Sequence, residues 1–125
     1  MAAGRAANVM RRDIAPVRPE DTLGRAAERM AALGTRELPV VEHDGHVVGI
    51  VSQCDMLPHR GHYEWTQVRA VMTPDVATVD PEAPLADIAR LLLAHGINAV
   101  PVVEGDRLVG MVSRVELLRP LADGG

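Results

Sequence analysis

The chain repeats one phrase, and this repeat limits its possible folds more than any other feature. Residues 39–55 read PVVEHDGHVVGIVSQCD, and residues 101–116 read PVVEGDRLVGMVSRVE. A shift of 62 positions aligns residues 9–42 with 71–104 without a gap, and 15 of the 34 aligned positions are identical. Average residue usage gives about two identities by chance over such a length. The chain of 125 residues is therefore an internal duplication.

The sequence of each half of the duplication predicts an extended segment followed by a helix. Residues 13–17 and 76–79 are short β-branched runs, and each leads through a proline corner into a helical pattern. From Leu85 the apolar residues recur at i, i+3, i+4, i+7 and i+8, which is one helix face, and the first half repeats this pattern from Leu23.

Capping residues delimit the two predicted helices. In the first half, Asp21 is a candidate N-cap and Gly34 is the stop. In the second half, Pro84 stands in the first helical turn and Gly96 lies past the end.

A β-hairpin and a short helix complete each half. Residues 38–52 and 100–113 each hold two apolar strands around a turn with Gly and Asp, and the short helices that follow are expected to stop at Pro58 and Pro120. A unit of about fifty residues cannot bury both faces of its sheet alone. The predicted fold is therefore α/β of the α+β type, with two pseudo-twofold-related β-α-β-β-α repeats packed sheet to sheet.

Charge and composition exclude several classes of function. The chain has 17 acidic and 13 basic side chains, a net charge of −4 and no long basic run, which argues against a nucleic acid partner. No apolar run is long enough for a signal peptide core or a membrane span. The single cysteine allows no internal disulfide. These features predict a cytoplasmic protein.

The ordered set of motifs resembles a tandem pair of CBS domains. Three motifs carry this resemblance: VMTPDV at residues 71–76, the Gly-x-x-x-x-Pro pattern at residues 34–39 and 96–101, and GIVSQCD at residues 49–55. The resemblance covers residue 8 to about residue 121. It divides the chain into repeat 1 at 8–58, a linker at 59–69 and repeat 2 at 70–122, which together form one Bateman module.

The resemblance implies a non-catalytic sensor rather than an enzyme. Such modules commonly bind adenosine-containing ligands, such as AMP, ADP, ATP, S-adenosylmethionine or NAD, in the cleft between repeats, with or without magnesium. They often form homodimers and regulate another protein, which here is expected to act in trans. No required cofactor is implied. The sequence shows no nucleophile with its base, no paired acid and base, and no metal cluster in a cleft.

Ser52 and Asp55 are the leading site candidates. In the family's pattern the Asp of Ser-x-x-Asp takes the ribose and the Ser lies near the phosphates, where helix N–H groups favour anions. The alternative is that Ser52 and Asp55 form only a capping box. If both pairs of this kind serve only as caps, the chain is a ligand-free dimerisation or interaction scaffold.

The second copy has Ser113 and Glu116 in these positions. The extra methylene either moves the carboxylate further into the cleft or lets it curl back onto the helix. The second site is therefore expected to be weaker, altered in ligand, or empty.

Eight further residues are candidates for nucleotide contacts through the same resemblance. Polar contacts are expected from Arg36, where the alternative is a solvated pair with Glu37 or Asp44, and from Asn98. Backbone and apolar contacts to the base are expected from four positions for which ordinary core and strand roles stay open: Thr35, Ile14, Ile97 and Val76. Arg18 and Asp80 stand at the corner before a proline, where the family's adenine contacts are partly backbone and the side chains matter little.

Cys54 and the linker carry weaker signals. Cys54 aligns with Val115, so a small apolar packing site is favoured over a reactive thiol. The histidines at 59 and 62 with Glu64 are a poor metal motif. The only aromatic residues, Tyr63 and Trp65, indicate that the linker is anchored, either on its own repeat or at a dimer or partner surface.

Overall fold

The computed structural model describes residues 4–122, with side chains up to residue 119, and divides the chain into two compact units. The central unit spans Asp13–Val76. The terminal unit combines the part of the chain before Asp13 with the part from Ala77 onward. Each unit therefore contains most of one repeat and a short segment of the other repeat.

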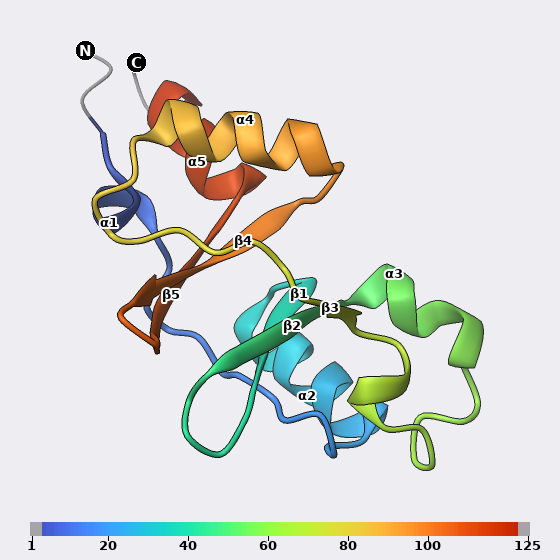
Figure 1. Ribbon diagram of the computed structural model, residues 1–125. Coiled ribbons are helices and arrows are strands. Elements are labelled where there is room, and N and C mark those ends of the chain that lie inside the picture. Colours follow the sequence, from blue (N-terminus) through green and yellow to red (C-terminus); the bar gives the residue numbers. More distant parts are fainter. Residues whose placement is uncertain (1–3, 123–125) are drawn as a thin grey trace. The chain divides into compact units, whose positions relative to one another are not determined.

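The central unit is built on a three-stranded antiparallel sheet in the order β1-β2-β3 (Figure 1). Strands β1 and β2 form a hairpin that pairs Glu37 with Ser52 at its open end. The elements are α2 (Leu23–Leu33), β1 (Glu37–Val41), β2 (Val47–Ser52), α3 (Gln53–Met56), the 3₁₀ turns η1 (Leu57–His59) and η2 (Val68–Ala70), and β3 (Thr73–Pro74).

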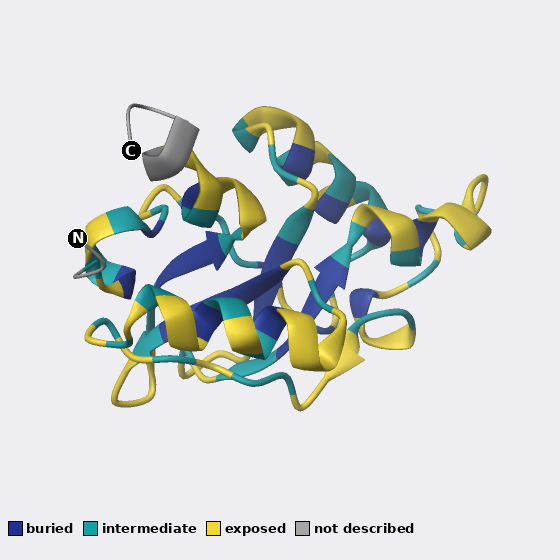
Figure 2. Ribbon diagram, turned by 90° about the horizontal axis from the view of Figure 1, so that it is seen from above, coloured by how far each residue is buried: buried dark blue, intermediate teal, exposed yellow. Residues whose placement is uncertain are grey.

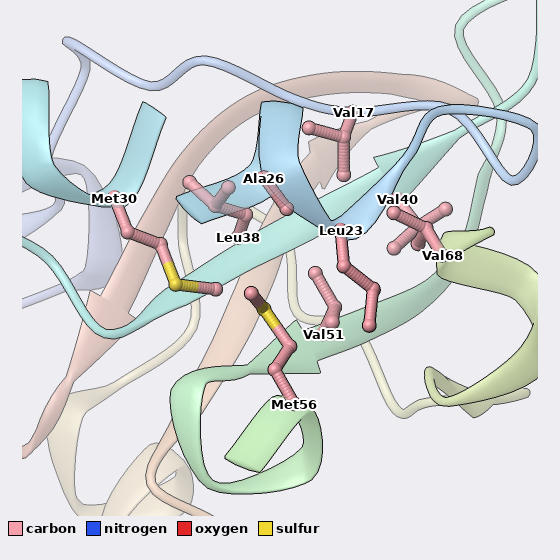
Figure 3. Close-up of a cluster of buried hydrophobic side chains, with 9 residues drawn as sticks. All are labelled: Val17, Leu23, Ala26, Met30, Leu38, Val40, Val51, Met56 and Val68. Atoms are coloured by element: carbon pink, nitrogen blue, oxygen red, sulfur yellow. The ribbon is translucent and has the colours of Figure 1, made fainter. Parts of the chain in front are cut away.

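The core of the central unit lies between α2 and the sheet (Figure 3). Leu23, Ala26 and Met30 follow one another at i, i+3 and i+7, so they share the buried face of α2. Side chains of the strands, such as Leu38 and Val51, complete the cluster. Full burial of a Leu or Val side chain contributes roughly 1.5–3 kcal/mol, so this face holds α2 on the sheet.

The terminal unit repeats the arrangement with a two-stranded sheet, β4-β5. Its elements are α1 (Ala6–Val9), α4 (Leu85–His95), β4 (Ala99–Glu104), β5 (Arg107–Ser113) and α5 (Arg114–Ala122). Ile88 and Leu92 of α4 pack with Val100, Val102 and other strand residues. In both units the strands are mostly buried and the helices are exposed on one side (Figure 2).

Each sheet receives a segment from the other repeat. In the terminal unit a Cβ on Gly110 would lie 2.6 Å from Met10 Sδ and 2.9 Å from the Arg11 carbonyl oxygen. In the central unit a Cβ on Gly49 would lie 2.6 Å from the Thr73 carbonyl oxygen, with Met72 Sδ at 3.1 Å. A glycine inside a strand often marks such a close approach, and both glycines are visible in the sequence.

The α/β fold class and the order of helices and hairpins predicted from the sequence are confirmed. The prediction of strands at residues 13–17 and 76–79 was wrong. Val17 and Val79 each form only a single parallel bridge, to Val40 and Val102. A strand needs several consecutive paired residues, whereas in each of these segments only one residue pairs with the hairpin.

Two predicted helix ends also need correction. The N-cap of α2 is Thr22, whose hydroxyl accepts a hydrogen bond from Arg25 N at 3.2 Å, whereas Asp21 accepts one from Arg18 N. Helix α5 continues past Pro120 to Ala122, so the predicted stop at Pro120 was wrong. Within residues 4–122, no helix has the length and apolar character needed to cross a membrane.

Candidate functional site

In the central unit, the open end of the β1–β2 hairpin brings four of the predicted residues together. Ser52 ends β2 opposite Glu37, and α3 begins at the next residue. The Arg36 carbonyl accepts a hydrogen bond from Gln53 N at 2.8 Å, which fixes the segment before β1 against the first turn of α3. Thr35 and Arg36 therefore lie beside Ser52 and Asp55. The role of Gln53 had no signal in the sequence.

Ser52 and Asp55 form a reciprocal capping box. The Ser52 hydroxyl accepts from Asp55 N at 3.1 Å, and Asp55 Oδ2 accepts from Ser52 N at 3.2 Å. Asp55 Oδ1 accepts no hydrogen bond within residues 4–122. The capping role is thus real, and it leaves one oxygen of a partly buried carboxylate available to a ligand.

Arg36 has an exposed side chain with no ion pair to any residue that the structure describes. The alternative pairing with Glu37 or Asp44 is absent from this part of the chain, and Asp44 Oδ1 instead accepts from His46 N at 3.0 Å. Thr35 is partly buried, and its hydroxyl donates to the Glu37 carbonyl at 3.2 Å. A guanidinium donates to phosphate oxygens and a carboxylate accepts from hydroxyls, so residues of these two types in neighbouring segments are suited to a ligand with both groups.

Ile14 and Arg18 flank the bridge between Val17 and Val40. Because that pairing is parallel, partly buried Ile14 lies toward the open end of the hairpin. Arg18 lies toward the turn between β1 and β2, where its guanidinium contacts His43. Four residues of a strand span about 13 Å, so Arg18 lies about that far along β1 from the open end of the hairpin. The structure therefore does not bring Arg18 together with Asp55.

In the terminal unit, Ser113 and Glu116 adopt a different geometry. Glu116 is 3% exposed, and its Oε1 accepts from Ser113 N at 2.7 Å and from the Ser113 hydroxyl at 2.6 Å. Of the two geometries that the sequence left open, the carboxylate has therefore curled back onto its own helix.

Ile97 and Asn98 occupy the places of Thr35 and Arg36. The Asn98 carbonyl accepts from Arg114 N at 3.2 Å, which is the counterpart of the Arg36 contact. The Asn98 side chain is exposed, and Ile97 packs against the core of the terminal unit.

Val76 and Asp80 lie close to the boundary between the two units, Val76 in the central unit and Asp80 in the terminal unit. Val76 is partly buried and belongs to the central unit, where it follows Asp75, a non-glycine residue with a φ of 53°. Asp80 is exposed, and its Oδ1 accepts from Glu82 N at 2.7 Å in the turn before α4.

Cys54 was predicted as an apolar packing site, and this was wrong. Cys54 is a free, exposed cysteine, and its counterpart Val115 is 56% exposed. Both follow the first residue of a short helix whose buried face is carried by other positions, such as Met56 in α3. The alignment of a cysteine with a valine indicated only that either residue is tolerated.

Of the two alternatives for the linker, the structure shows anchoring on its own repeat, and the contact is made through Tyr63. Tyr63 packs against the central core, and its carbonyl accepts from Gly24 N at 3.1 Å. Trp65 is 75% exposed and lies near the His62 ring, with ring centroids 6.0 Å apart. Among the described residues, no group of three or more His, Cys, Asp or Glu side chains is arranged to hold a metal ion.

The chain belongs to the CBS domain family, whose sequence model matches residues 6–60 and 68–123. An uncharacterized protein of Methanocaldococcus jannaschii is 30% identical over 131 residues, which cover 92% of this chain and 31% of the relative. The chain thus spans about a third of that relative's length.

Solved CBS structures share the fold. The CBS domain pair of protein MJ0100, in complex with 5′-methylthioadenosine and S-adenosyl-L-methionine, has a TM-score of 0.88 and 21% identity, covering 98% of both chains. CBSX2 in complex with AMP has a TM-score of 0.82 and 25% identity, covering 96% of this chain and 97% of its own. The two CBS repeats predicted from the sequence are confirmed.

Proposed function

We propose that this chain is a non-catalytic regulatory module that binds an adenosine-containing ligand and signals its occupancy to a separate protein. The observation that carries the proposal is the Asp55 carboxylate, which keeps one oxygen uncommitted in the first turn of α3, where Gln53 N also holds the backbone of Arg36. The AMP complex of CBSX2, a protein of the same fold and 25% identity, supports an adenosine-containing ligand.

The residues at the start of α3 suit such a ligand chemically. A carboxylate oxygen accepts hydrogen bonds from ribose hydroxyls, and a guanidinium donates to phosphate oxygens. In this proposal Asp55 binds the ribose, Ser52 and Arg36 bind phosphate, and Thr35 and Ile14 contact the base. Magnesium is an optional companion of a di- or triphosphate, because the ligand would bring its own oxygen donors.

The remaining predicted contacts belong to the proposal with smaller roles. Arg18 lies at the hairpin turn and Asp80 in the turn before α4. In this proposal each of them contacts only the outermost groups of the ligand. In repeat 2 the corresponding set is Ser113, Glu116, Ile97 and Asn98, and Val76 is proposed as an apolar contact to the base of a ligand.

Thermal unfolding tests the proposal. We would measure Tm with AMP, ADP, ATP, S-adenosylmethionine or NAD, each with and without magnesium, and with GMP as the control. A ligand at about a hundred times its Kd adds about 2.7 kcal/mol, which corresponds to roughly 10 °C for a chain of this length. The shift should vanish in Asp55→Asn and persist in Asp106→Asn, an exposed aspartate in the β4–β5 turn.

Two results would contradict the proposal. Folded protein that shows no shift with any adenine ligand does not bind one at these concentrations. Chemical conversion of the nucleotide, detected by chromatography of the ligand recovered after incubation, would make the protein an enzyme.

Signalling in trans predicts that immobilised protein captures a partner in amounts that differ between AMP-loaded and ligand-free columns, with Asp55→Asn removing the difference.

A second candidate function is a ligand-free scaffold that assembles through its helices. Helices α4 and α5 pack together, and they expose large apolar side chains: Leu93 at 78%, Val115 at 56% and Leu118 at 59%. Large apolar groups exposed in this way are suited to a homodimer interface. Light scattering after size exclusion tests this, because a dimer through these helices should dissociate in Leu118→Glu and persist in Arg119→Glu.

A further inference from the structure

Residues 57–66, the Trp65 loop, follow α3 and present the single tryptophan of the chain to solvent (Figure 1). Trp65 is 75% exposed, and Leu57 in the same loop is 45% exposed. The loop joins the core of the central unit through Tyr63, and Trp65 is not among the side chains that pack on this core. Folding of the central unit therefore leaves Trp65 without a packing role.

Hydrogen bonds hold the backbone of Trp65 in one conformation. The His62 carbonyl accepts from Trp65 N and Thr66 N, both at 3.1 Å, and from the Thr66 hydroxyl at 2.8 Å. The carbonyls of Tyr63 and Thr66 accept from the first two residues of α2, at 3.1 and 2.9 Å. Because the backbone on both sides of Trp65 is already bound, a partner would order little of this loop on binding.

The charges of the Trp65 loop are balanced and unpaired. Its carboxylate and guanidinium groups are those of Glu64 and Arg60, and both residues are exposed. Neither makes an ion pair in the part of the chain that the structure describes. Nucleic acids and anionic membranes attract surfaces with an excess of basic groups. A loop with one charge of each sign is suited instead to a partner that also carries both signs.

A second copy of the chain is such a partner. In a twofold contact the same patch faces itself, so each pairing of two different residues occurs twice. Arg60 of each copy can then pair with Glu64 of the other copy, which satisfies all four charges. Tryptophan and arginine are the residue types that most often carry the binding energy of an interface, and aromatic rings pack well in offset or edge-to-face pairs.

We propose that the Trp65 loop is a self-association surface, at which two copies of the chain pack their Trp65 side chains together and exchange ion pairs between Arg60 and Glu64. The loop belongs to the central unit, whereas α4 and α5 belong to the terminal unit, so this surface is separate from the exposed helices. The contact needs no bound nucleotide. A loop of this length supplies fewer than the ~20–30 residues a side of a standard interface, so the Kd should lie between about 10 µM and 1 mM.

The fluorescence of Trp65 tests the contact directly, because the chain has no other tryptophan. The Leu118→Glu variant is used beside wild-type protein to remove association through α4 and α5, and a reducing agent prevents disulfides of Cys54. As the protein concentration rises from about 10 µM to 1 mM, the emission should shift to shorter wavelengths and iodide should quench it less. Sedimentation of the same samples should show a dimer forming over the same range.

Charge reversal tests the proposed pairing. Arg60→Glu or Glu64→Arg alone places like charges opposite each other and should weaken association at least tenfold. The two changes combined in one chain should restore the Kd to within about threefold of the unreversed chain. Glu28→Arg, the same change at an exposed acid of α2, should leave the Kd unchanged. Trp65→Ala should weaken association at least tenfold in sedimentation.

Three results would overturn the proposal. The first is a chain that stays monomeric up to about 1 mM with unchanged Trp65 emission. The second is association that survives Trp65→Ala, which places the contact on another surface. The third is a double charge reversal that fails to restore what each single reversal removes. Each of them leaves the proposed nucleotide binding intact, because that binding is measured separately with adenine ligands.

Discussion

Alanine in place of Gly49 should push β3 away from β2. The new Cβ would lie 2.6 Å from the Thr73 carbonyl oxygen, whereas ordinary contacts begin at 3.4 Å. That oxygen belongs to the backbone and cannot rotate away. It must withdraw by several tenths of an ångström and strain the pairing of Ile50 with Thr73.

The expected cost follows from two opposing terms. Overpacking in a well-packed region costs about 1–3 kcal/mol. Replacing glycine in a strand returns about 0.5–1 kcal/mol through the lower entropy of the unfolded chain. Because the obstructing atom at Gly49 is a backbone oxygen, the upper part of the overpacking range applies, about 2–3 kcal/mol, and Gly49→Ala should destabilise by about 1–2.5 kcal/mol. Gly110→Ala should cost no more, because its nearest atom at 2.6 Å is the Sδ of the flexible Met10 side chain.

Gly24→Ala is the matched control. Gly24 lies in α2, and a Cβ there would meet its nearest atoms at 3.7 and 3.8 Å, so this variant should gain about 0.5–1 kcal/mol. Urea unfolding followed by circular dichroism measures all three variants. A neutral or stabilising Gly49→Ala would refute the close approach of β3 and the exchange of segments between the repeats.

Three further predictions concern single positions. Asp75→Val should destabilise by about 1–2 kcal/mol in urea unfolding, because the φ of 53° is poorly tolerated by a β-branched residue, whereas Asp75→Asn should be neutral. Cys54→Ser should change stability by less than about 0.5 kcal/mol, and a thiol reagent should label native wild-type protein once. Leu23→Ala should cost about 2–5 kcal/mol, since Leu23 is fully buried, and a loss below 1 kcal/mol would contradict the core described for α2.

The elements with a strong local signal could be predicted from the sequence. Helix α4 follows from apolar residues on one face and from Gly96, which adopts the left-handed conformation expected of a helix stop. The hairpins follow from two apolar runs around a turn that contains Gly and Asp. At the start of α2, adjacent Asp21 and Thr22 are both good caps, so local preference could not choose between them.

The exchange of segments could not be predicted in this way. Met10 and Met72 occupy equivalent places in the two repeats, as do Gly49 and Gly110. The repeat pattern is equally consistent with each methionine packing on the glycine of its own copy or of the other copy. Only the long-range pairing of Arg11 with Met111 and of Thr73 with Ile50 decides.

The candidate site was predictable in composition but only partly in geometry. Ser52, Asp55, Thr35 and Arg36 come together because the hairpin joins residues far apart in sequence. For Glu116 the sequence left two directions open, and the side chain follows the one that supplies hydrogen-bond donors to a buried carboxylate. Arg18 contacts His43 in the hairpin turn, a pairing that no local pattern indicates.

The most direct test of the central claim is an AMP titration of ¹⁵N-labelled protein followed by amide chemical shifts. The account predicts saturable changes at residues 35–36 and 52–55, with the amides of 113–116 little affected, and loss of these changes in Asp55→Asn. Changes centred on residues 97–98 and 113–116, or no saturable change in a folded protein, would contradict a binding site built on Asp55.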